Sequence, residues 1–397
     1  MMTKLSQYVR GDRVIWFAVI MLSIFGMLAV YSSTSTLAYK LQGGDTEYYL
    51  FKHFTFILVG LFAMWIFHNL PYKLFSKNLF FPFFYLSIFF LILVLFWGNA
   101  INDARRWMTV FGIRFQVSDF AKITLIMYLA RYLSVKQETI KSFKETFIPA
   151  MGFIVGICFL IAIHDLSTAI ILFVTSFILL FVGRVHFFQL ISVTLAMFLV
   201  AVLAVIVLRS TPDSTLADKG RLLTWKHRIE GYSNPEQQAI DNYQVRQAEI
   251  AIARGGILPN GPGNSKQKNF LPHPYSDYIY AIIIEEYGLL GGLTIIVLYL
   301  LILFRTIRMV IKAPKAYPVF LAFGLCLLLV FQAFTHMAVA VNLFPVTGLT
   351  LPMVSMGGSS MIFTSVAMGI ILSVSQEIYR QEESTIPIDS IPEQNSL

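Results

Sequence analysis

Three carboxylates lie where a polar stretch of the chain meets an apolar one, within residues 271–292 (LPHPYSDYIYAIIIEEYGLLGG). Asp277 ends the polar stretch, and Glu285 and Glu286 follow about two helical turns into the apolar run. Ionisable groups at membrane depth are costly and usually functional. An acid held where a water-facing loop meets a lipid-facing helix can serve a substrate with a lipid tail and a polar head. The pattern therefore indicates chemistry on a lipid-linked molecule.

The composition defines the elements that must position these acids. The chain is 57% hydrophobic and 13% charged, with a mean hydropathy of +0.70. A hydrocarbon core of about 30 Å needs about 20 apolar residues per helix. About ten such runs are present, at 14–34, 50–68, 79–98, 117–133, 146–163, 167–183, 187–208, 279–304, 319–341 and 350–374. We therefore predict an all-α integral membrane protein of about ten transmembrane helices.

The ten runs divide the chain into a membrane domain and its flanking segments. Residues 14–376 are expected to form one polytopic domain, with 209–277 as a large extracytoplasmic loop that contains short helices. With the N-terminus inside, the inner loops hold 15 Lys and Arg residues and the short outer loops hold 5. This bias predicts that residues 1–13 are cytoplasmic and that 377–397 form a disordered cytoplasmic tail. The net charge of +8 follows mostly from this topology, so no nucleic-acid partner is expected.

Several chemistries have no support in the sequence. Cys158 and Cys326 lie in apolar runs, where core packing is expected and a disulfide is not. No histidine pair has metal-ligand spacing, and the segment GGILPNGPGNSK lacks the ending of a nucleotide-binding P-loop. The residues alone therefore predict neither a protein-bound metal nor an ATP site.

The large loop has its own helix signals. Residues 221–232 (RLLTWKHRIEGY) mix apolar and basic side chains, which is typical of an amphipathic helix on the membrane surface. Asn234 and Pro235 form a helix start, and Gly255 and Gly256 an ending, so a helix is predicted over 235–254. A loop this organised is more often functional than a solvated tether, which is the alternative.

A second polar cluster lies within residues 105–122 (RRWMTVFGIRFQVSDFAK). If a helix has begun by Ser118, then Asp119 and Lys122 share one of its faces, and Arg114 lies just before it. Two interpretations stay open. The pair is either an internal ion pair that allows burial of Lys122, or part of a cationic clamp for phosphate in which Asp119 orients Arg114 or Lys122.

The third polar patch lies at residues 344–360 (FPVTGLTLPMVSMGGSS) and enters the last apolar run. Its glycines and serines favour close packing of small residues between helices. Ser359 and Ser360 have no His and Asp partners in the sequence pattern, so a serine nucleophile is not expected. His164 and Asp165 form another polar pair, for which a structural role is expected.

These segments together resemble the SEDS family (shape, elongation, division and sporulation) of FtsW and RodA type, from the first apolar run to Gln376. The signatures that carry the resemblance are Arg106-Trp107, Gly112, Arg114-Phe115-Gln116, Ser118-Asp119 and Lys122; Asp165, Leu166 and Thr168; Ala251-Ile252 and Gly255-Gly256; Leu271-Pro272, Ser276-Asp277-Tyr278, Glu285-Glu286, Gly288 and Gly291; and Pro345, GLTLP at 348–352, Ser355 and GGSS at 357–360. The GLTLP segment is closer to the FtsW division branch. The chain departs from the usual family residues at Val117, Asp119, His164, Ser167, His336, Ala338, Asn342, Thr347 and Met356.

The resemblance implies a peptidoglycan glycosyltransferase that polymerises lipid II during cell division in the bacterial inner membrane, at the septum. It implies that Asp277 is the catalytic base for an inverting transfer, with a divalent cation (Mg²⁺ or Mn²⁺) at the pyrophosphate. The implied substrate-binding residues are Arg106, Trp107, Arg114, Asp119, Lys122, Ser276, Glu285, Glu286, Ser359 and Ser360. The implied partners are a class B penicillin-binding protein, which is a transpeptidase, and other membrane proteins of the division machinery.

Other functions remain open on the sequence. Ten spans with no ATP site also suit a flippase for lipid-linked precursor, and the chain could instead be a RodA-like elongation polymerase or a scaffold that catalyses nothing.

The two adjacent glutamates pose a separate question. Neighbouring residues on a helix point about 100° apart, so only one of Glu285 and Glu286 is expected to face the Asp277 side.

Overall fold

The computed structural model describes residues 11–35, 37, 39, 46–77, 80–101, 104–110, 113–212, 226 and 243–385. Ten helices of 15 residues or more lie in these ranges: α2 (Arg13–Ser33), α4 (Thr46–Asn69), α6 (Phe80–Trp97), α7 (Val117–Val135), α8 (Ile148–Ala162), α9 (Leu166–Val182), α10 (Phe187–Ser210), α15 (Ile279–Ile311), α16 (Ala316–Ala340) and α17 (Ser359–Thr385). In the described part of the chain, seven helical segments are long and apolar enough to cross a membrane, and α6 and α9 are shorter apolar helices. The predicted all-α membrane architecture is confirmed.

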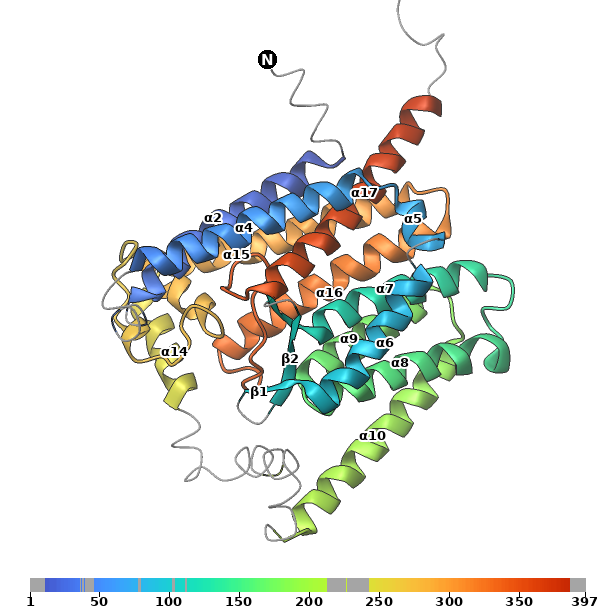
Figure 1. Ribbon diagram of the computed structural model, residues 1–397, viewed down its shortest axis with the longest axis horizontal. Coiled ribbons are helices and arrows are strands. Elements are labelled where there is room, and N and C mark those ends of the chain that lie inside the picture. The colour runs from blue at the N-terminus through green and yellow to red at the C-terminus, as the bar shows by residue number, and fades with distance from the viewer. Residues whose placement is uncertain are drawn as a thin grey trace, which may run out of the picture.

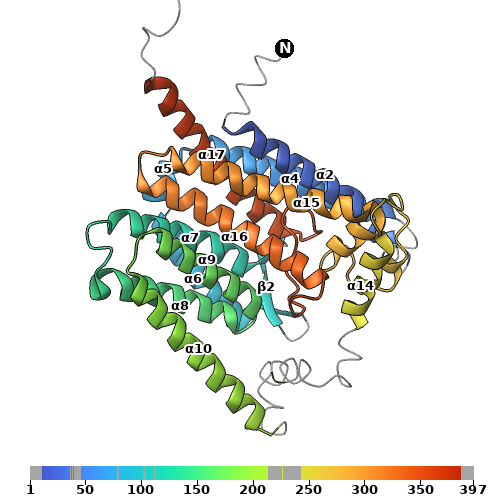
Figure 2. The same ribbon diagram turned by 180° about the vertical axis from the view of Figure 1, so that it is seen from behind.

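The helices form two groups joined by α16 (Figures 1 and 2). On one side, α16 packs on α15 and α17, and α2 and α4 pack on these two helices in turn. On its other side α16 packs on α7 and α9, which contact α6 and α8. Consequently α16 is buried along most of its length, and its polar side chains can reach both groups.

Helix α10 lies apart from both groups in Figures 1 and 2. Most of its residues are exposed, although the helix is apolar on all sides. A helix that is hydrophobic all round must be surrounded by apolar material. Lipid is the environment that suits it.

A small antiparallel sheet precedes α7 and was not predicted. It consists of β1 (Asn99–Ile101), β2 (Ala104–Val110) and β3 (Ile113–Gln116), in the order β1-β2-β3. Trp107 is paired with Gln116 and Thr109 with Arg114. Because β3 runs directly into α7, the sheet fixes the direction from which the chain enters that helix.

The last apolar run begins its helix later than predicted. The prediction placed a span at 350–374, but α17 starts at Ser359, and residues 349–358 form a loop that is largely buried. Pro352 lacks the amide hydrogen that a helix interior needs, and Gly358 has a φ of 57°. These two residues explain why an apolar stretch does not form a helix here. We call residues 349–358 the buried loop.

Helix α17 also ends later than predicted. Residues 377–385, assigned above to a disordered tail, continue the helix to Thr385. Lys73, in the short helix α5 (Tyr72–Lys77), lies 3.1 Å from Glu377, and Lys312 lies 3.0 Å from Glu382. The polar end of α17 thus remains helical beside cations of two other elements.

The predicted helix over 235–254 is seen in its second half, as α14 (Tyr243–Gly255). Its proposed start at Asn234 and Pro235, and the amphipathic helix predicted for 221–232, lie outside the described residues apart from Lys226. Two shorter helical turns complete the described elements, a π-helical turn (Phe143–Phe147) before α8 and a 3₁₀ turn (Gln267–Asn269) in the loop before α15. Cys158 and Cys326 are both buried and free, which confirms their assignment to the core.

Asp12 joins three helices at the end of the bundle where α2 begins. Its carboxylate accepts from the Val14 amide at 2.9 Å and from Arg305 Nε at 2.8 Å, and the Tyr379 hydroxyl donates to it at 3.2 Å. The Asp12 side chain is 0% exposed and that of Arg305 is 27% exposed. This cluster therefore clamps α2, α15 and α17 together.

Replacing Arg305 by Gln is expected to lower the free energy of unfolding by about 2 kcal/mol. Breaking a fully buried pair costs about 3–5 kcal/mol, and here the helix cap and Tyr379 still stabilise the carboxylate. Unfolding in detergent, followed by circular dichroism, measures the change. The matched control is Arg308→Gln on the exposed side of the same helix, with an expected loss below about 1 kcal/mol. Equal losses in the two variants would contradict this role of Asp12.

Candidate active site

Asp277 lies in the last turn of the polar loop, directly before α15, as predicted. Its side chain is half-buried. The Ser276 hydroxyl donates to Asp277 Oδ1 at 2.7 Å, and within the described residues Oδ2 accepts no hydrogen bond. One carboxylate oxygen is therefore held in place while the other is available to an incoming donor.

The buried loop holds the chain around Asp277. The Ser355 hydroxyl donates to the Ser276 carbonyl at 2.8 Å, and the Met356 amide donates to the Tyr275 carbonyl at 3.0 Å. Ser355 also accepts from the Leu351 amide at 2.8 Å. These bonds fix the backbone on which Asp277 stands.

Two phenols accompany the carboxylate. Burial raises the pKa of Tyr275, and the neighbouring Asp277 raises it further. Burial and then Asp277 also raise the pKa of Tyr278, which is 1% exposed. Both phenols therefore stay protonated at neutral pH and add no second anion beside Asp277.

Asp119 and Lys122 form a buried ion pair. Helix α7 begins at Val117, so the two share a face as predicted, with Lys122 Nζ 2.8 Å from Asp119 Oδ1. Their side chains are only 5% and 7% exposed. Lys122 also donates to Gln332 Oε1 at 2.9 Å, and Gln332 donates to the Thr350 carbonyl at 2.9 Å. The pair thus connects α7 through α16 to the buried loop.

Arg106 and Asp165 form a second polar contact. Arg106 Nε donates to the His164 carbonyl at 2.7 Å, and Arg106 Nη1 lies 3.6 Å from Asp165 Oδ2. Asp165 also caps α9 by accepting from the Thr168 amide at 3.2 Å, and it accepts from Gln116 at 3.2 Å. Asp165 therefore connects α9 to β2 and β3, while His164 contributes its backbone carbonyl.

Arg114 differs from the other predicted cations. It lies on β3 with an exposed side chain, and no carboxylate of the described residues lies within ion-pairing distance of it. The idea that Asp119 orients Arg114 is not supported by any contact, because Asp119 binds Lys122 instead. Arg114 is consequently available to bind an anion. Trp107, in the neighbouring strand, is half-buried.

Ser359 and Ser360 connect the start of α17 to β3 and to the buried loop. Ser359 Oγ accepts from the Gln116 amide at 3.2 Å, and Ser360 Oγ lies 3.1 Å from Thr350 Oγ1. The prediction of small-residue packing between helices is wrong for residues 349–358, because these residues are not helical. Their small side chains instead allow backbone and hydroxyl groups to approach closely.

Glu285 and Glu286 hold a different part of the loop. Glu285 accepts from the Ser265 hydroxyl and from the Lys266 amide, the latter at 3.1 Å. Glu286 accepts from the Ser32 hydroxyl and lies 3.4 Å from the Ser265 amide. Both side chains are buried, at 2% and 0% exposure. The expectation that one of the two would face the Asp277 side is not met, because the bonds of both carboxylates go to the loop around Ser265 and to Ser32, and no contact joins either to Asp277 among the described residues.

Sequence reasoning missed His336 and Gln332 as site residues. His336 Nδ1 donates to the Leu349 carbonyl at 2.7 Å, which leaves Nε2 as a buried acceptor without a partner among the described residues. His336 thereby bonds the same buried loop that holds the chain around Asp277. The only signal in the sequence was that His336 departs from the usual family residue.

The described residues do not fit a divalent cation held by the protein. Among them, no three His, Cys, Asp or Glu side chains converge as a metal-binding group. The magnesium or manganese ion implied by the resemblance is therefore not assigned to protein ligands, and no step of the mechanism depends on it.

The tight contact of α14 with α15 stabilises the loop that leads to Asp277. A Cβ atom at Gly255 would overlap the Ile284 carbonyl, which lies next to the glutamate pair. Gly255→Ala is therefore expected to displace α14 and to cost about 1–3 kcal/mol of unfolding free energy. Gly152→Ala in α8 is the control, because its Cβ meets nothing within 4 Å. Hydrogen exchange of α14 and thermal unfolding measure both, and equal behaviour would contradict the close approach.

Comparison with known proteins identifies the family. A family model described as the FtsW/RodA/SpoVE cell cycle protein matches residues 12–380. A probable peptidoglycan glycosyltransferase FtsW of Geobacter sp. (strain M18) is 33% identical over 370 residues, covering 92% of this chain and 96% of that protein. The stage V sporulation protein E of Bacillus subtilis (strain 168) is 32% identical over 375 residues, covering 92% and 97%. The chain belongs to the FtsW/RodA/SpoVE family.

Solved structures show the same fold. A structure described as "Structural coordination of polymerization and crosslinking by a peptidoglycan synthase complex" matches with a TM-score of 0.72 at 24% identity, covering 93% of this chain and 99% of that chain. The rod shape determining protein RodA of Thermus thermophilus matches with a TM-score of 0.66 at 22% identity, covering 93% and 98%. The arrangement of helices is thus that of a known class of membrane proteins.

Proposed function

We propose that this chain is a peptidoglycan glycosyltransferase that polymerises lipid II into glycan strands during cell division, with Asp277 as its base. Membership of the family and the FtsW relatives support the activity and the division role. The observation that carries the assignment of the base is the half-buried Asp277 carboxylate, with one oxygen bonded to Ser276 and the other unpaired among the described residues. It lies where a polar loop enters an apolar helix, which suits a substrate with a lipid tail.

The chemistry is a single displacement. The 4-hydroxyl of the terminal GlcNAc of an incoming lipid II attacks the anomeric carbon of the growing glycan, while Asp277 takes the hydroxyl proton. The new carbon–oxygen bond forms as the bond to the lipid pyrophosphate breaks, and the pyrophosphate leaves with the bonding electrons. Attack from the face opposite the leaving group inverts the anomeric carbon. Ser276, bonded to Oδ1, orients Asp277 for this transfer.

The leaving pyrophosphate needs positive charge. Arg114 is the predicted cation with an exposed side chain and no ion-pair partner in the described part of the chain, and a guanidinium can bind phosphate through two parallel hydrogen bonds. Lys122 is already shared by Asp119 and Gln332, so we assign it to positioning α7 and the buried loop. Trp107 lies two residues from Thr109, the strand partner of Arg114, and therefore on the same face of the sheet as Arg114. Arg106 lies on the other face, where it bonds the His164 carbonyl and lies near Asp165, so we assign it to positioning the sheet.

The partner and the location follow from the same assignment. A polymerase of this kind leaves uncrosslinked strands, so a transpeptidase of the class B penicillin-binding proteins is the expected partner, with other membrane proteins of the division machinery. The structurally similar peptidoglycan synthase complex, described as coordinating polymerization and crosslinking, supports this expectation. The bias of Lys and Arg in the short loops favours both termini in the cytoplasm and the Asp277 loop outside, in the inner membrane at the septum.

The purified protein with labelled lipid II tests the function. We expect glycan chains, with a higher yield when a transpeptidase partner is present. A flippase would instead move labelled lipid II across vesicles without forming chains. Transport without chains, with the partner present, would overturn the proposed activity in favour of the flippase.

A further inference from the structure

A cavity of about 530 Å³ lies far from the candidate active site, between α5, the start of α6 and the end of α7. It is lined by Ser76, Phe81, Tyr128, Arg131, Tyr132, Val135 and Lys136. A rise of about 1.5 Å per residue along α7 puts Lys136 roughly 25 Å from Asp119. The cavity is therefore near the opposite face of the hydrocarbon core from Asp277.

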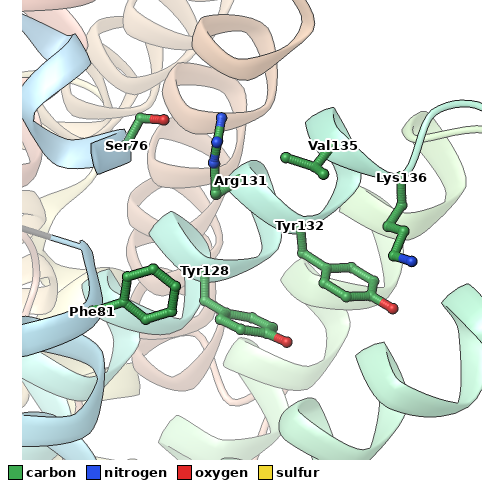
Figure 3. Close-up of a pocket in the computed structure, with 7 residues that line it drawn as sticks. All are labelled: Ser76, Phe81, Tyr128, Arg131, Tyr132, Val135 and Lys136. Carbon is green, nitrogen blue, oxygen red and sulfur yellow. The ribbon is translucent and has the colours of Figure 1, made fainter. Parts of the chain in front are cut away.

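The cavity presents positive charge without compensation. Arg131 and Lys136 are half-buried, and no carboxylate of the described residues lies within ion-pairing distance of either. The Ser76 hydroxyl adds a hydrogen-bond donor at the same wall. Figure 3 shows Arg131 directed to the Ser76 side and Lys136 beyond Tyr132. Two cations and a hydroxyl around one cavity favour an anion, and a phosphate fits a guanidinium well.

The remaining wall is aromatic and rigid. Tyr128 stacks on Phe84 with ring centroids 4.5 Å apart, and its ring lies 5.7 Å from that of Tyr132. The Tyr132 hydroxyl donates to the Glu145 carbonyl at 3.0 Å and is thereby fixed to the loop before α8. Packed aromatic rings thus form this wall of the cavity.

An apolar stripe leads from the cavity along α6. Phe81, Tyr85 and Phe89 follow at intervals of four residues and are 58%, 61% and 55% exposed. In a membrane-spanning helix, such a stripe meets acyl chains. A ligand with an anionic head and an apolar tail can therefore place its head at Arg131 and Lys136 and its tail along α6.

We propose that this cavity binds an anionic glycerophospholipid of the cytoplasmic leaflet, with its phosphate at Arg131 and the Ser76 hydroxyl and with Lys136 adding positive charge at the other side of the cavity. Basic pockets between membrane helices on the cytoplasmic side are known to bind anionic headgroups. The leaflet rests on the orientation proposed above, and the binding itself is independent of polymerisation. A bound lipid would join α5 and α6 to α7 at the end of the bundle remote from Asp277.

Native mass spectrometry of the delipidated full chain with equimolar phosphatidylglycerol and phosphatidylcholine tests the proposal. The wild type is expected to retain phosphatidylglycerol preferentially. The Arg131→Gln/Lys136→Gln variant should bind it about tenfold to thirtyfold more weakly, given about 1 kcal/mol per cation. The control is Arg308→Gln/Lys315→Gln, which removes one exposed cation from the last turn of α15 and one from the turn that follows it. This variant should keep the preference for phosphatidylglycerol.

Three results would overturn the lipid site. The first is that the wild type binds the two lipids equally, and the second is that both double variants lose phosphatidylglycerol binding to the same extent. The third is that undecaprenyl phosphate at equal concentration displaces phosphatidylglycerol. If the double variant does not fold, the single variant Lys136→Gln, at a partly exposed position, takes its place. It is expected to give an intermediate loss of phosphatidylglycerol binding. Because the readout is bound lipid, a failure here leaves the glycosyltransferase assignment unaffected, and a failure of that assignment leaves this result standing.

Discussion

Asp277→Asn is expected to lower the maximal rate of lipid II polymerisation by about 10²–10⁴-fold, the usual contribution of a positioned general base. The amide keeps the size of the side chain and can still accept the Ser276 hydrogen bond at Oδ1. It cannot take the proton of the acceptor hydroxyl. Steady-state rates over a range of lipid II concentrations measure the loss, which should fall on kcat with little change in KM.

Two comparisons separate the base from a merely structural carboxylate. Asp277→Glu keeps the acid but moves it by one methylene, so partial activity is expected. Ser276→Ala removes the bond that orients Oδ1 and should cost less than Asp277→Asn, about tenfold, since the base itself remains. A Ser276→Ala loss as large as that of Asp277→Asn, with both proteins folded, would place the essential group elsewhere in the loop.

Lys122→Met is expected to give one of the largest stability losses in the protein, about 3–5 kcal/mol of unfolding free energy. It leaves the Asp119 carboxylate, whose side chain is 5% exposed, without its cation. Asp119 Oδ2 already lacks a partner among the described residues, so the negative charge has few other sources of stabilisation. Unfolding in detergent, compared with wild type, measures the loss.

The double variant Asp119→Leu/Lys122→Met decides between the two roles considered for this pair. Replacing both members of a buried ion pair by apolar residues is often nearly neutral for stability. If the pair is structural, as its burial indicates, the double variant should regain stability and polymerise within about threefold of wild type. If Lys122 binds the pyrophosphate, stability returns but polymerisation does not, and the positioning role assigned to Lys122 is then wrong.

The parts of the fold that the sequence predicted are those governed by local composition. The apolar runs predicted the ten long helices, because a membrane span must satisfy its backbone internally and reads as continuous hydrophobicity. The spacing of Asp119 and Lys122 predicted their contact, since residues three apart share a helix face. The position of Asp277 directly before α15 was predicted because a carboxylate at the border between polar and apolar segments stands out against its neighbours.

The parts that were missed depend on contacts between distant segments. Residues 350–358 are apolar enough for a span, yet they form a loop whose bonds go to residues 275, 276 and 332. No local pattern shows those partners. Likewise, the angle between Glu285 and Glu286 suggested that one of them faces Asp277, but the loop around Ser265 contacts both carboxylates instead.

His336 illustrates a further limit of the sequence. As a lone histidine in an apolar run, it would ordinarily be assigned to the core. Only the structure shows that Leu349 fixes Nδ1 as the donor and that the buried Nε2 faces no described partner. This contact of α16 with the buried loop joins segments that are distant in the sequence.

A single-turnover measurement tests whether the Asp277 carboxylate performs the proton transfer. Wild type and Asp277→Asn would be loaded with saturating labelled lipid II beside the partner transpeptidase, and the first glycosidic bond would be timed by rapid quenching. Lipid II binding would be measured on the same preparations. If Asp277 is the base, Asp277→Asn should bind lipid II within about threefold of wild type and form the first bond at least about 10²-fold more slowly. Bond formation at the wild-type rate in Asp277→Asn would contradict this role of Asp277.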